Sequence, residues 1–277
     1  MNKNFMELGL IAKNETFFIA EAGINHGGSL KKAIKLIDKA SEAGADAVKF
    51  QTYISELRAP KGNSEILEIL KKCELPFEDF STLKSYADSK NIQFFSTPFD
   101  NESASFLSKL DCNIAKIASF DSSNNILLNH SSKLFKTLIL SVGMTTIEEI
   151  DNFVEVLKSN NCNPVILHCV SSYPMNYSDA RLVNINYLSS KYPFLIGYSD
   201  HSTGIQVPLY AIAAGAKVIE KHFMLEDDDC IDKPVSIDVN LFKKLIEESK
   251  ILNSILGELS FGIRESEQQT KIFKRKS

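Results

Sequence analysis

Short apolar runs alternate along this chain with segments in which apolar residues recur at helical spacing. Leu30, Ala33, Ile34 and Ile37 follow one such helical face, and Ser29 before them is a suitable N-cap. Eight apolar runs of strand length lie at 17–23, 46–51, 93–97, 114–119, 137–141, 164–170, 194–197 and 217–220. This regular alternation of strand and helix predicts a parallel sheet with helices outside it.

Eight consecutive strand–helix units favour a closed (β/α)₈ TIM barrel over an open doubly wound sheet. The chain has 277 residues, close to the ~250 typical of such a barrel, and it lacks the G-x-G-x-x-G signature of dinucleotide-binding sheets. We expect the N-terminal extension to close the bottom of the barrel as a hairpin. The expected segments are an extension at 1–16, a single barrel domain at 17–259 and a polar tail or linker at 260–277.

Composition narrows the classes of function. Hydrophobic residues make up 44% and charged residues 24% of the chain, which is typical of a globular protein. The net charge of −4 gives no indication of nucleic-acid or membrane binding, so any anionic substrate must be held by locally placed cations. No signal peptide or membrane span is evident, and the five cysteines form no C-x-x-C pair. We therefore expect a cytoplasmic protein without disulfides.

Polar residues occur near the C-terminal end of each expected strand. Parallel barrel strands are buried on both faces, so an ionisable side chain there is costly without a partner, and barrel enzymes place their chemistry at this end. For any single residue a structural role stays open, such as a Glu21–Lys49 ion pair. We expect all of these polar side chains to converge on one rim of the barrel. The residues are Glu21, Lys49, Gln51, Thr97, Lys116, Ser119, Ser141, His168, Ser171, Asp200, His201 and His222.

The residue types suggest an anion site. Lys49 and Lys116 are cations on buried strands, and hydroxyl groups end three of the strands at Thr97, Ser119 and Ser141. Ammonium and hydroxyl donors together would hold a phosphate or a phosphorylated carboxylate.

His201 and His222 end consecutive strands and are candidate ligands for a divalent metal. Such a metal can polarise a carbonyl and activate water, and Glu21 is a candidate acid or base near both histidines. Phosphate, metal and carbonyl chemistry together suggest carbon–carbon condensation or cleavage. From the residue types alone, an aldolase and a phosphohydrolase both stay open.

Seven motifs resemble those of the sialic acid (N-acetylneuraminate) synthase family, in the family's order and over nearly the whole barrel. They are IAEAGINHGG at 19–28, AVKFQTY at 47–53, FSTPFD at 95–100, KIAS at 116–119, HCVSSYP at 168–174, YSDH at 198–201 and IEKHF at 219–223.

This resemblance implies that phosphoenolpyruvate condenses with an N-acylated amino-hexose (ManNAc or a modified analogue), giving a nine-carbon α-keto acid and phosphate. It implies a divalent metal cofactor, Mn²⁺ or Mg²⁺, held by His201 and His222. The catalytic residues that it implies are Glu21, Lys49, Lys116, His201, His222 and Asp232. The substrate-binding residues are Gln51, Thr97, Phe99, Ser119, Ser141, Ser171, Tyr173 and Ser199.

The branch within the family stays open. Phe120 after Ser119 and the KHFM run at 221–224 are similar to pseudaminic acid synthases, whereas 65–76 is similar to the neuraminate and legionaminate branches. Family members usually continue past the position of Ser277 into a small antifreeze-like domain, which this sequence lacks. We therefore expect a catalytic barrel that works either without this cap or with one supplied in trans by a separate chain. The resemblance also implies a homodimer.

Two other functions stay open beside the leading one. A related barrel synthase or aldolase could use another aldehyde, such as a sugar phosphate, for which Arg58 and Lys61 are the obvious extra cations. An inactive, ligand-binding barrel is the third reading. Retention of six ionisable site residues argues against it, because buried charges without a use would be costly.

Overall fold

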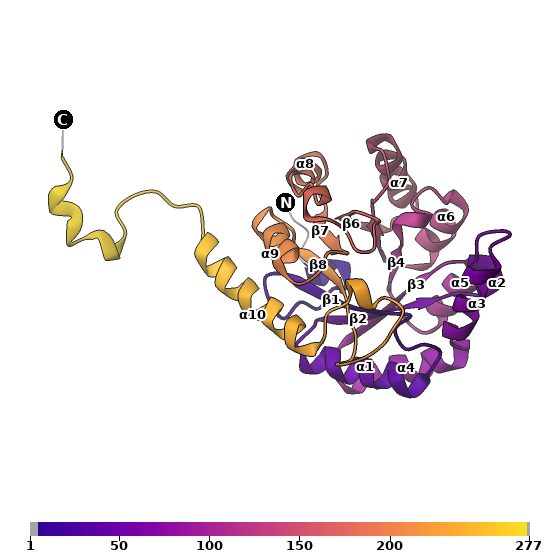
Figure 1. The fold of residues 1–277 in the computed structure, drawn as a ribbon. Helices are drawn as coiled ribbons and strands as arrows, with labels where there is room; N and C mark the ends of the chain where they lie inside the picture. Colours follow the sequence, from indigo (N-terminus) through magenta and orange to yellow (C-terminus); the bar gives the residue numbers. More distant parts are fainter. Residues whose placement is uncertain (1–4, 276–277) are drawn as a thin grey trace.

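The computed structural model describes residues 5–275, and within them eight parallel strands form one barrel sheet (Figure 1). The hydrogen-bonded order is β3-β2-β1-β8-β7-β6-β5-β4, and the terminal strands β3 and β4 contact each other to bring the barrel close to closure. The predicted (β/α)₈ TIM barrel is confirmed. The strands are β1 (Phe17–Gly23), β2 (Ala47–Thr52), β3 (Gln93–Pro98), β4 (Ile114–Ile117), β5 (Thr137–Ser141), β6 (Asn163–Cys169), β7 (Leu195–Asp200) and β8 (Val218–His222).

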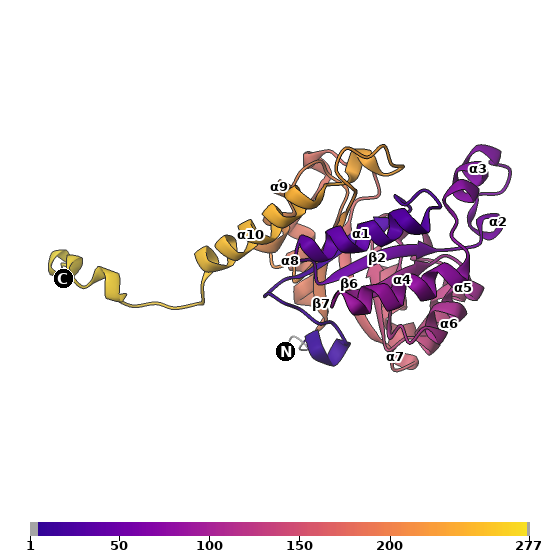
Figure 2. The ribbon, with the colours of Figure 1, turned by 90° about the horizontal axis from the view of Figure 1, so that it is seen from below.

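Helices surround this sheet. Ser29 caps the first of them as predicted, with the Lys32 N–H donating to its hydroxyl at 3.3 Å. Two helices that periodicity did not predict, α2 and α3, stand at the edge of the barrel (Figure 2). The helices are α1 (Leu30–Glu42), α2 (Ser55–Arg58), α3 (Ser64–Cys73), α4 (Phe77–Ser89), α5 (Asn101–Lys109), α6 (Asn125–Leu134), α7 (Ile147–Ser159), α8 (Val183–Lys191), α9 (Gln206–Ala213) and α10 (Val239–Leu256).

The interior of the barrel changes from apolar to charged along the strand direction. Successive strand residues face alternately into the barrel and toward the helices. Interior positions near the strand starts form one buried apolar cluster that includes Phe17, Ile19, Ala47, Phe95, Ile114, Ile139, Val165, Leu167, Leu195 and Val218. Later interior positions carry Glu21, Lys49, Lys116, Ser141, Ser199 and Glu220. The polar groups therefore gather at the carboxyl end, where this fold places its chemistry.

The N-terminal segment closes the apolar end. Leu8, in a 3₁₀ helix (η1, Phe5–Leu8), and Leu10 are fully buried in the interior cluster. The Thr137 hydroxyl donates to the Leu8 carbonyl at 2.9 Å, and the Gln93 amide donates to the Gly9 carbonyl at 2.6 Å. The expectation of a hairpin is wrong, because the described part of the segment contains no strand. The segment is held instead by packing of Leu8 and Leu10 into the interior cluster and by the bonds that Thr137 and Gln93 donate to its carbonyls.

Replacing Leu10 with alanine should lower the free energy of unfolding by about 2–5 kcal/mol, since it removes a buried side chain and leaves a cavity. Ile11 is 68% exposed and provides the matched control, for which alanine should change stability by less than about 0.5 kcal/mol. Guanidinium denaturation of both variants measures the difference. Equal midpoints would show that the segment does not stabilise the barrel.

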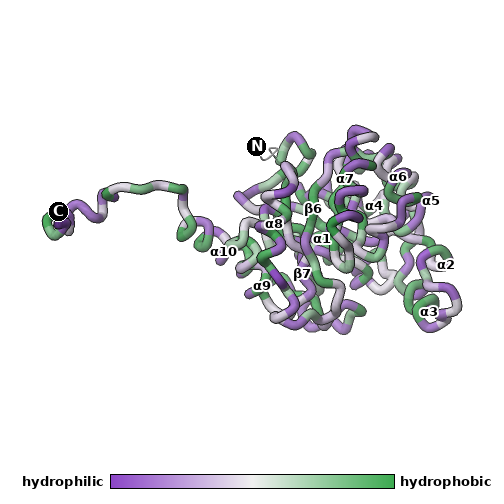
Figure 3. The backbone as a smooth tube through the Cα atoms, turned by 90° about the horizontal axis from the view of Figure 1, so that it is seen from above, coloured by the Kyte–Doolittle hydropathy of each residue, from purple (hydrophilic) through white to green (hydrophobic). Residues whose placement is uncertain are grey.

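Beyond α10 the described chain leaves the barrel. Gly257, with φ of +58°, follows the helix, and two short 3₁₀ turns lie farther along at Glu265–Glu267 and Thr270–Phe273. Figure 1 shows this segment extending away from the strands, and Figure 3 shows apolar residues along it. Leu259, Phe261 and Phe273 are each more than three-quarters exposed. No helix within residues 5–275 is long and apolar enough to cross a bilayer.

Candidate active site

A cavity of about 250 Å³ lies at the carboxyl end of the barrel. Ser171 does not line it, but its hydroxyl oxygen lies 2.7 Å from that of Ser119, so it supports a wall residue. The structure brings the other residues expected to act in catalysis, substrate binding or metal binding into one space. They are Glu21, Lys49, Gln51, Thr97, Phe99, Lys116, Ser119, Ser141, Tyr173, Ser199, His201, His222 and Asp232.

Two of the polar residues expected at the rim lie elsewhere. His168 packs its ring 5.6 Å from the Tyr198 ring, and its Nε2 hydrogen-bonds the Ala180 carbonyl at 2.8 Å. Asp200 forms a fully buried ion pair with Lys221, with 2.7 Å between Oδ2 and Nζ. The expectation that both join the rim is wrong, because each occupies a strand position that alternates out of phase with the interior ones.

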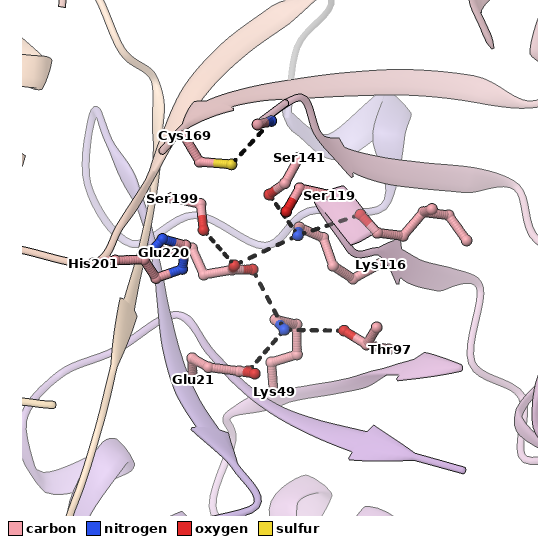
Figure 4. A network of polar contacts seen from close by, with 12 residues as sticks. Glu21, Lys49, Thr97, Lys116, Ser119, Ser141, Cys169, Ser199, His201 and Glu220 are labelled. Carbon is pink, nitrogen blue, oxygen red and sulfur yellow. Dashed lines mark hydrogen bonds and ion pairs between the residues drawn. The ribbon is translucent and has the colours of Figure 1, made fainter. Parts of the chain in front are cut away.

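Lys49 and Lys116 enter the cavity from β2 and β4, and the Glu220 carboxylate lies between them (Figure 4). Glu220 Oε2 is 3.6 Å from the Lys49 ammonium, and Oε1 is 3.5 Å from that of Lys116. The Ser199 hydroxyl donates to Oε1 at 2.8 Å. Burial disfavours this carboxylate, but the two lysines outweigh burial and lower the pKa of Glu220 to about 2. Glu220 is therefore ionised and holds both ammonium groups in place.

Each lysine also contacts a hydroxyl group. Lys49 donates to Thr97 at 3.0 Å, and Lys116 donates to Ser141 at 2.6 Å. Burial disfavours the charged form of both lysines. At Lys49 the carboxylates of Glu21, at 2.8 Å, and of Glu220 outweigh burial and raise the pKa, whereas at Lys116 burial dominates and the pKa is lowered. Lys49 with Thr97, and Lys116 with Ser141, therefore form two donor sets that face the same cavity.

Sequence reasoning did not single out Glu220. It lies two residues before His222 on β8, and residues two apart on a strand share a face. Assigning His222 to the interior would therefore have assigned Glu220 as well. Arg58 was considered only for a phosphorylated acceptor, yet it lines the same cavity. It lies in α2, a four-residue helix too short to give a periodic signal.

The two candidate metal ligands lie side by side, with 5.5 Å between the ring centres of His201 and His222. His201 Nδ1–H donates to the Val170 carbonyl at 2.7 Å, which leaves Nε2 free as an acceptor. Burial lowers the pKa of His201 to about 3, so its imidazole is neutral. Burial also disfavours charge on His222, but the Asp232 carboxylate, 3.4 Å from Nδ1, raises the pKa of that ring overall.

Asp232 is positioned by the loop after β1. Its N–H donates to Asn25 Oδ1 at 2.9 Å, and Asn25 Nδ2 donates to the Phe223 carbonyl at 2.9 Å. Gly23 beneath it has φ of +53°, and a Cβ atom there would lie 3.3 Å from both Asp232 Oδ2 and Glu21 Oε1. Glycine is thus required both for its backbone conformation and for the space it leaves at the carboxylates.

The donor set fits a divalent metal. His222 Nδ1 is buried, with the Asp232 carboxylate at 3.4 Å and no hydrogen bond among the described residues, and His201 offers a neutral Nε2. Among residues 5–275, no three His, Cys, Asp or Glu side chains converge as a preformed metal cluster. The protein would therefore supply two imidazoles, with Asp232 beside one of them, and leave positions open. Open positions are typical of catalytic rather than structural metal sites.

Comparison with known proteins shows the family to which this chain belongs. The NeuB family model matches residues 36–260. Pseudaminic acid synthase of Campylobacter jejuni is 34% identical over 276 residues, covering 94% of this chain and 80% of that protein. The N,N'-diacetyllegionaminic acid synthase of Legionella pneumophila is 36% identical over 87% of this chain and 73% of that protein.

A crystal structure of N-acetylneuraminic acid (sialic acid) synthetase from Leptospira borgpetersenii, in complex with citrate, superposes with a TM-score of 0.89. The identity is 42%, and the match covers 94% of this chain and 91% of that one. A truncated 3-deoxy-D-arabino-heptulosonate 7-phosphate synthase from Thermotoga maritima, at 19% identity and a TM-score of 0.68, shares the fold. The chain is therefore an enzyme of the NeuB family, whose members include pseudaminic and legionaminic acid synthases.

Proposed function

We propose that this protein is a phosphoenolpyruvate-dependent nonulosonic acid synthase. It would condense phosphoenolpyruvate with an N-acylated amino-hexose and release phosphate. The observation that supports this most is the Lys49–Glu220–Lys116 arrangement, with its hydroxyl partners, in the same cavity as the His201–His222 pair. An anion site next to a metal site suits a reaction in which a phosphate ester meets a carbonyl compound.

The lysine pair would bind phosphoenolpyruvate. Lys49 with Thr97 and Lys116 with Ser141 offer converging donors for its phosphate and carboxylate groups. Among the described residues that line the cavity, three cations face three carboxylates. They are Lys49, Arg58 and Lys116 against Glu21, Glu220 and Asp232. Because these charges balance, a multiply charged anion would bind better with an additional cation, which a divalent metal would provide.

His201 and His222 would hold Mn²⁺ or Mg²⁺. When bound, the metal supplies Lewis acidity toward the carbonyl oxygen of the acceptor. Asp232 would orient the His222 ring from 3.4 Å, and Tyr173 packs its ring 4.2 Å from the His201 ring, which restricts that side chain.

In the reaction, C3 of phosphoenolpyruvate would bond to the aldehyde carbon, water would add at C2, and phosphate would leave by cleavage of the C2–O bond. The water loses one proton as it adds at C2, the former aldehyde oxygen gains one to become a hydroxyl group, and the second proton of the water leaves with phosphate when C2 becomes a carbonyl. One residue must accept the first of these protons. Glu21 is placed for this, since its carboxylate accepts from Gln51 Nε2 at 3.0 Å and pairs with Lys49 at 2.8 Å. These two contacts fix both of its oxygens toward the phosphoenolpyruvate site.

One alternative has a specific observation behind it. An acceptor that carries phosphate would need a further cation, and Arg58 lines the cavity whereas Lys61 is exposed. An inactive barrel is disfavoured, because a buried, ionised network is costly to maintain without a ligand. A homodimer, a cap domain in trans and a cytoplasmic location stay predictions from the sequence.

Phosphate release from phosphoenolpyruvate in the presence of Mn²⁺ tests the proposal. The acceptor panel contains N-acetylmannosamine, its 6-phosphate and di-N-acylated 6-deoxyhexoses, each with and without chelator. We expect release that depends on an N-acylated sugar and stops when the metal is removed. Release that requires a phosphorylated acceptor would favour the alternative, and release that needs no sugar would contradict a synthase.

A further inference from the structure

Arg58 is held in the cavity wall by aromatic contacts. Its guanidinium carbon lies 3.8 Å from the ring centre of Phe99 and 4.4 Å from that of Tyr53. The two rings are nearly perpendicular, at 82°, so they restrain the guanidinium from two directions. Cation–π contacts of this kind fix the position of an arginine while using none of its N–H donors.

One donor group of Arg58 has no partner in the part of the protein that the structure describes. Its Nη1 is buried without a hydrogen-bond partner among the described residues. The carboxylates of Asp232, Asp121 and Glu21 act on it only through longer-range electrostatics. Buried donors in native proteins are nearly always paired, so an unpaired one in a cavity wall indicates an acceptor atom on a ligand. Gln51 Oε1, also in this wall, is likewise unpaired.

The position of Arg58 assigns it to the second substrate. The phosphoenolpyruvate site that we propose is built on β2, β4 and β8, whereas Arg58 comes from α2, beyond the end of β2. Arginine offers donors only, so the ligand atom must be an oxygen or another acceptor. Because carboxylates already act on this guanidinium, a neutral carbonyl oxygen is favoured over a second phosphate.

We propose that Arg58 determines acceptor specificity by donating to the carbonyl oxygen of the N-acyl group of the sugar. This inference rests on the proposed synthase function and deepens it. A charge-assisted hydrogen bond of this type should contribute about 10- to 100-fold in affinity. The contribution appears only with acceptors that carry an acyl group.

The test compares Arg58→Met with wild type, using N-acetylmannosamine and mannose as a pair of sugars with and without the acyl group. We expect the KM for the acylated sugar to rise about 10- to 100-fold. The KM for phosphoenolpyruvate and the rate with mannose should not change. Arg58→Lys should restore only part of the loss, because a single ammonium lacks the planar fork. Lys61→Met removes an exposed cation from the turn that follows α2 and should behave as wild type.

Two kinetic results would overturn the assignment. An unchanged KM for the acylated sugar in Arg58→Met would make the residue structural, and a loss confined to the 6-phosphate would identify an anion site. Calorimetric titration of N-acetylmannosamine onto the protein with phosphoenolpyruvate and Mn²⁺ gives the same comparison without turnover. If phosphate release fails but this titration still separates wild type from variant, the synthase proposal fails and the Arg58 assignment stands. If wild type does not bind the acylated sugar, the assignment fails.

Discussion

Lys116→Met is expected to lower kcat for phosphate release by about 10²–10³-fold, the loss typical of removing one preorganised donor to developing negative charge. Lys116 holds the Ser141 hydroxyl at 2.6 Å and lies 3.5 Å from Glu220, so its loss disables one of the two donor sets. It also leaves Glu220 with a single cation, which should raise the pKa of that carboxyl. Steady-state kinetics with saturating sugar measures the effect.

Folding must be separated from chemistry in this variant, because breaking a buried ion pair can cost about 3–5 kcal/mol. Circular dichroism and a thermal melt establish that the barrel is folded before rates are compared. Lys158→Met, which removes an exposed lysine paired with Glu155 on α7, is the matched control and should retain full activity. Wild-type affinity for phosphoenolpyruvate in folded Lys116→Met would remove Lys116 from the anion site.

His222→Ala is expected to weaken Mn²⁺ binding by more than about 100-fold, since one of two imidazole ligands is lost. Chelator-sensitive phosphate release should disappear with it, while the barrel stays folded. Equilibrium dialysis with Mn²⁺ measures the affinity directly, without relying on activity. His130→Ala is the control, because His130 lies on α6 and contacts Ser105 rather than the cavity.

Asp232→Asn extends this test. The amide keeps the shape of the side chain but loses the charge that acts on His222, so Mn²⁺ affinity should fall by about 10- to 100-fold. If His222→Ala binds Mn²⁺ with the same affinity as wild type in equilibrium dialysis, His222 is excluded as a metal ligand. Equal affinities for Asp232→Asn and wild type would limit Asp232 to the sugar side of the cavity.

The barrel could be predicted from the sequence because its strands repeat one simple pattern. Apolar runs such as 137–141 and 164–170 are buried on both faces, and the intervening helices show clear periodicity. Candidate residues near strand ends could be predicted too, since strand ends converge in this fold. His168 and Asp200 were misassigned because a position near a strand end does not by itself give the direction of the side chain.

Other features depend on contacts between residues far apart in the sequence, which local sequence patterns do not predict. Arg58 reaches the cavity because Phe99, forty-one positions along the chain, packs against it. The N-terminal closure depends on Thr137 and Gln93, which anchor backbone carbonyls from a segment more than eighty residues away. Glu220 is different, because strand phase alone would have placed it beside His222.

The change from apolar to charged side chains along the inside of the barrel affects which substitutions such a protein can accept. Leu8, Leu10 and the apolar cluster lie at one end, and the charged groups around Glu220 lie at the other. Stabilising substitutions can accumulate at the closed end without moving the lysines, and they would offset destabilising changes elsewhere. Segments at the open end, such as the short helix α2 that carries Arg58, are then free to vary. One scaffold can in this way acquire new acceptor substrates while the buried charged network around Glu220 is retained.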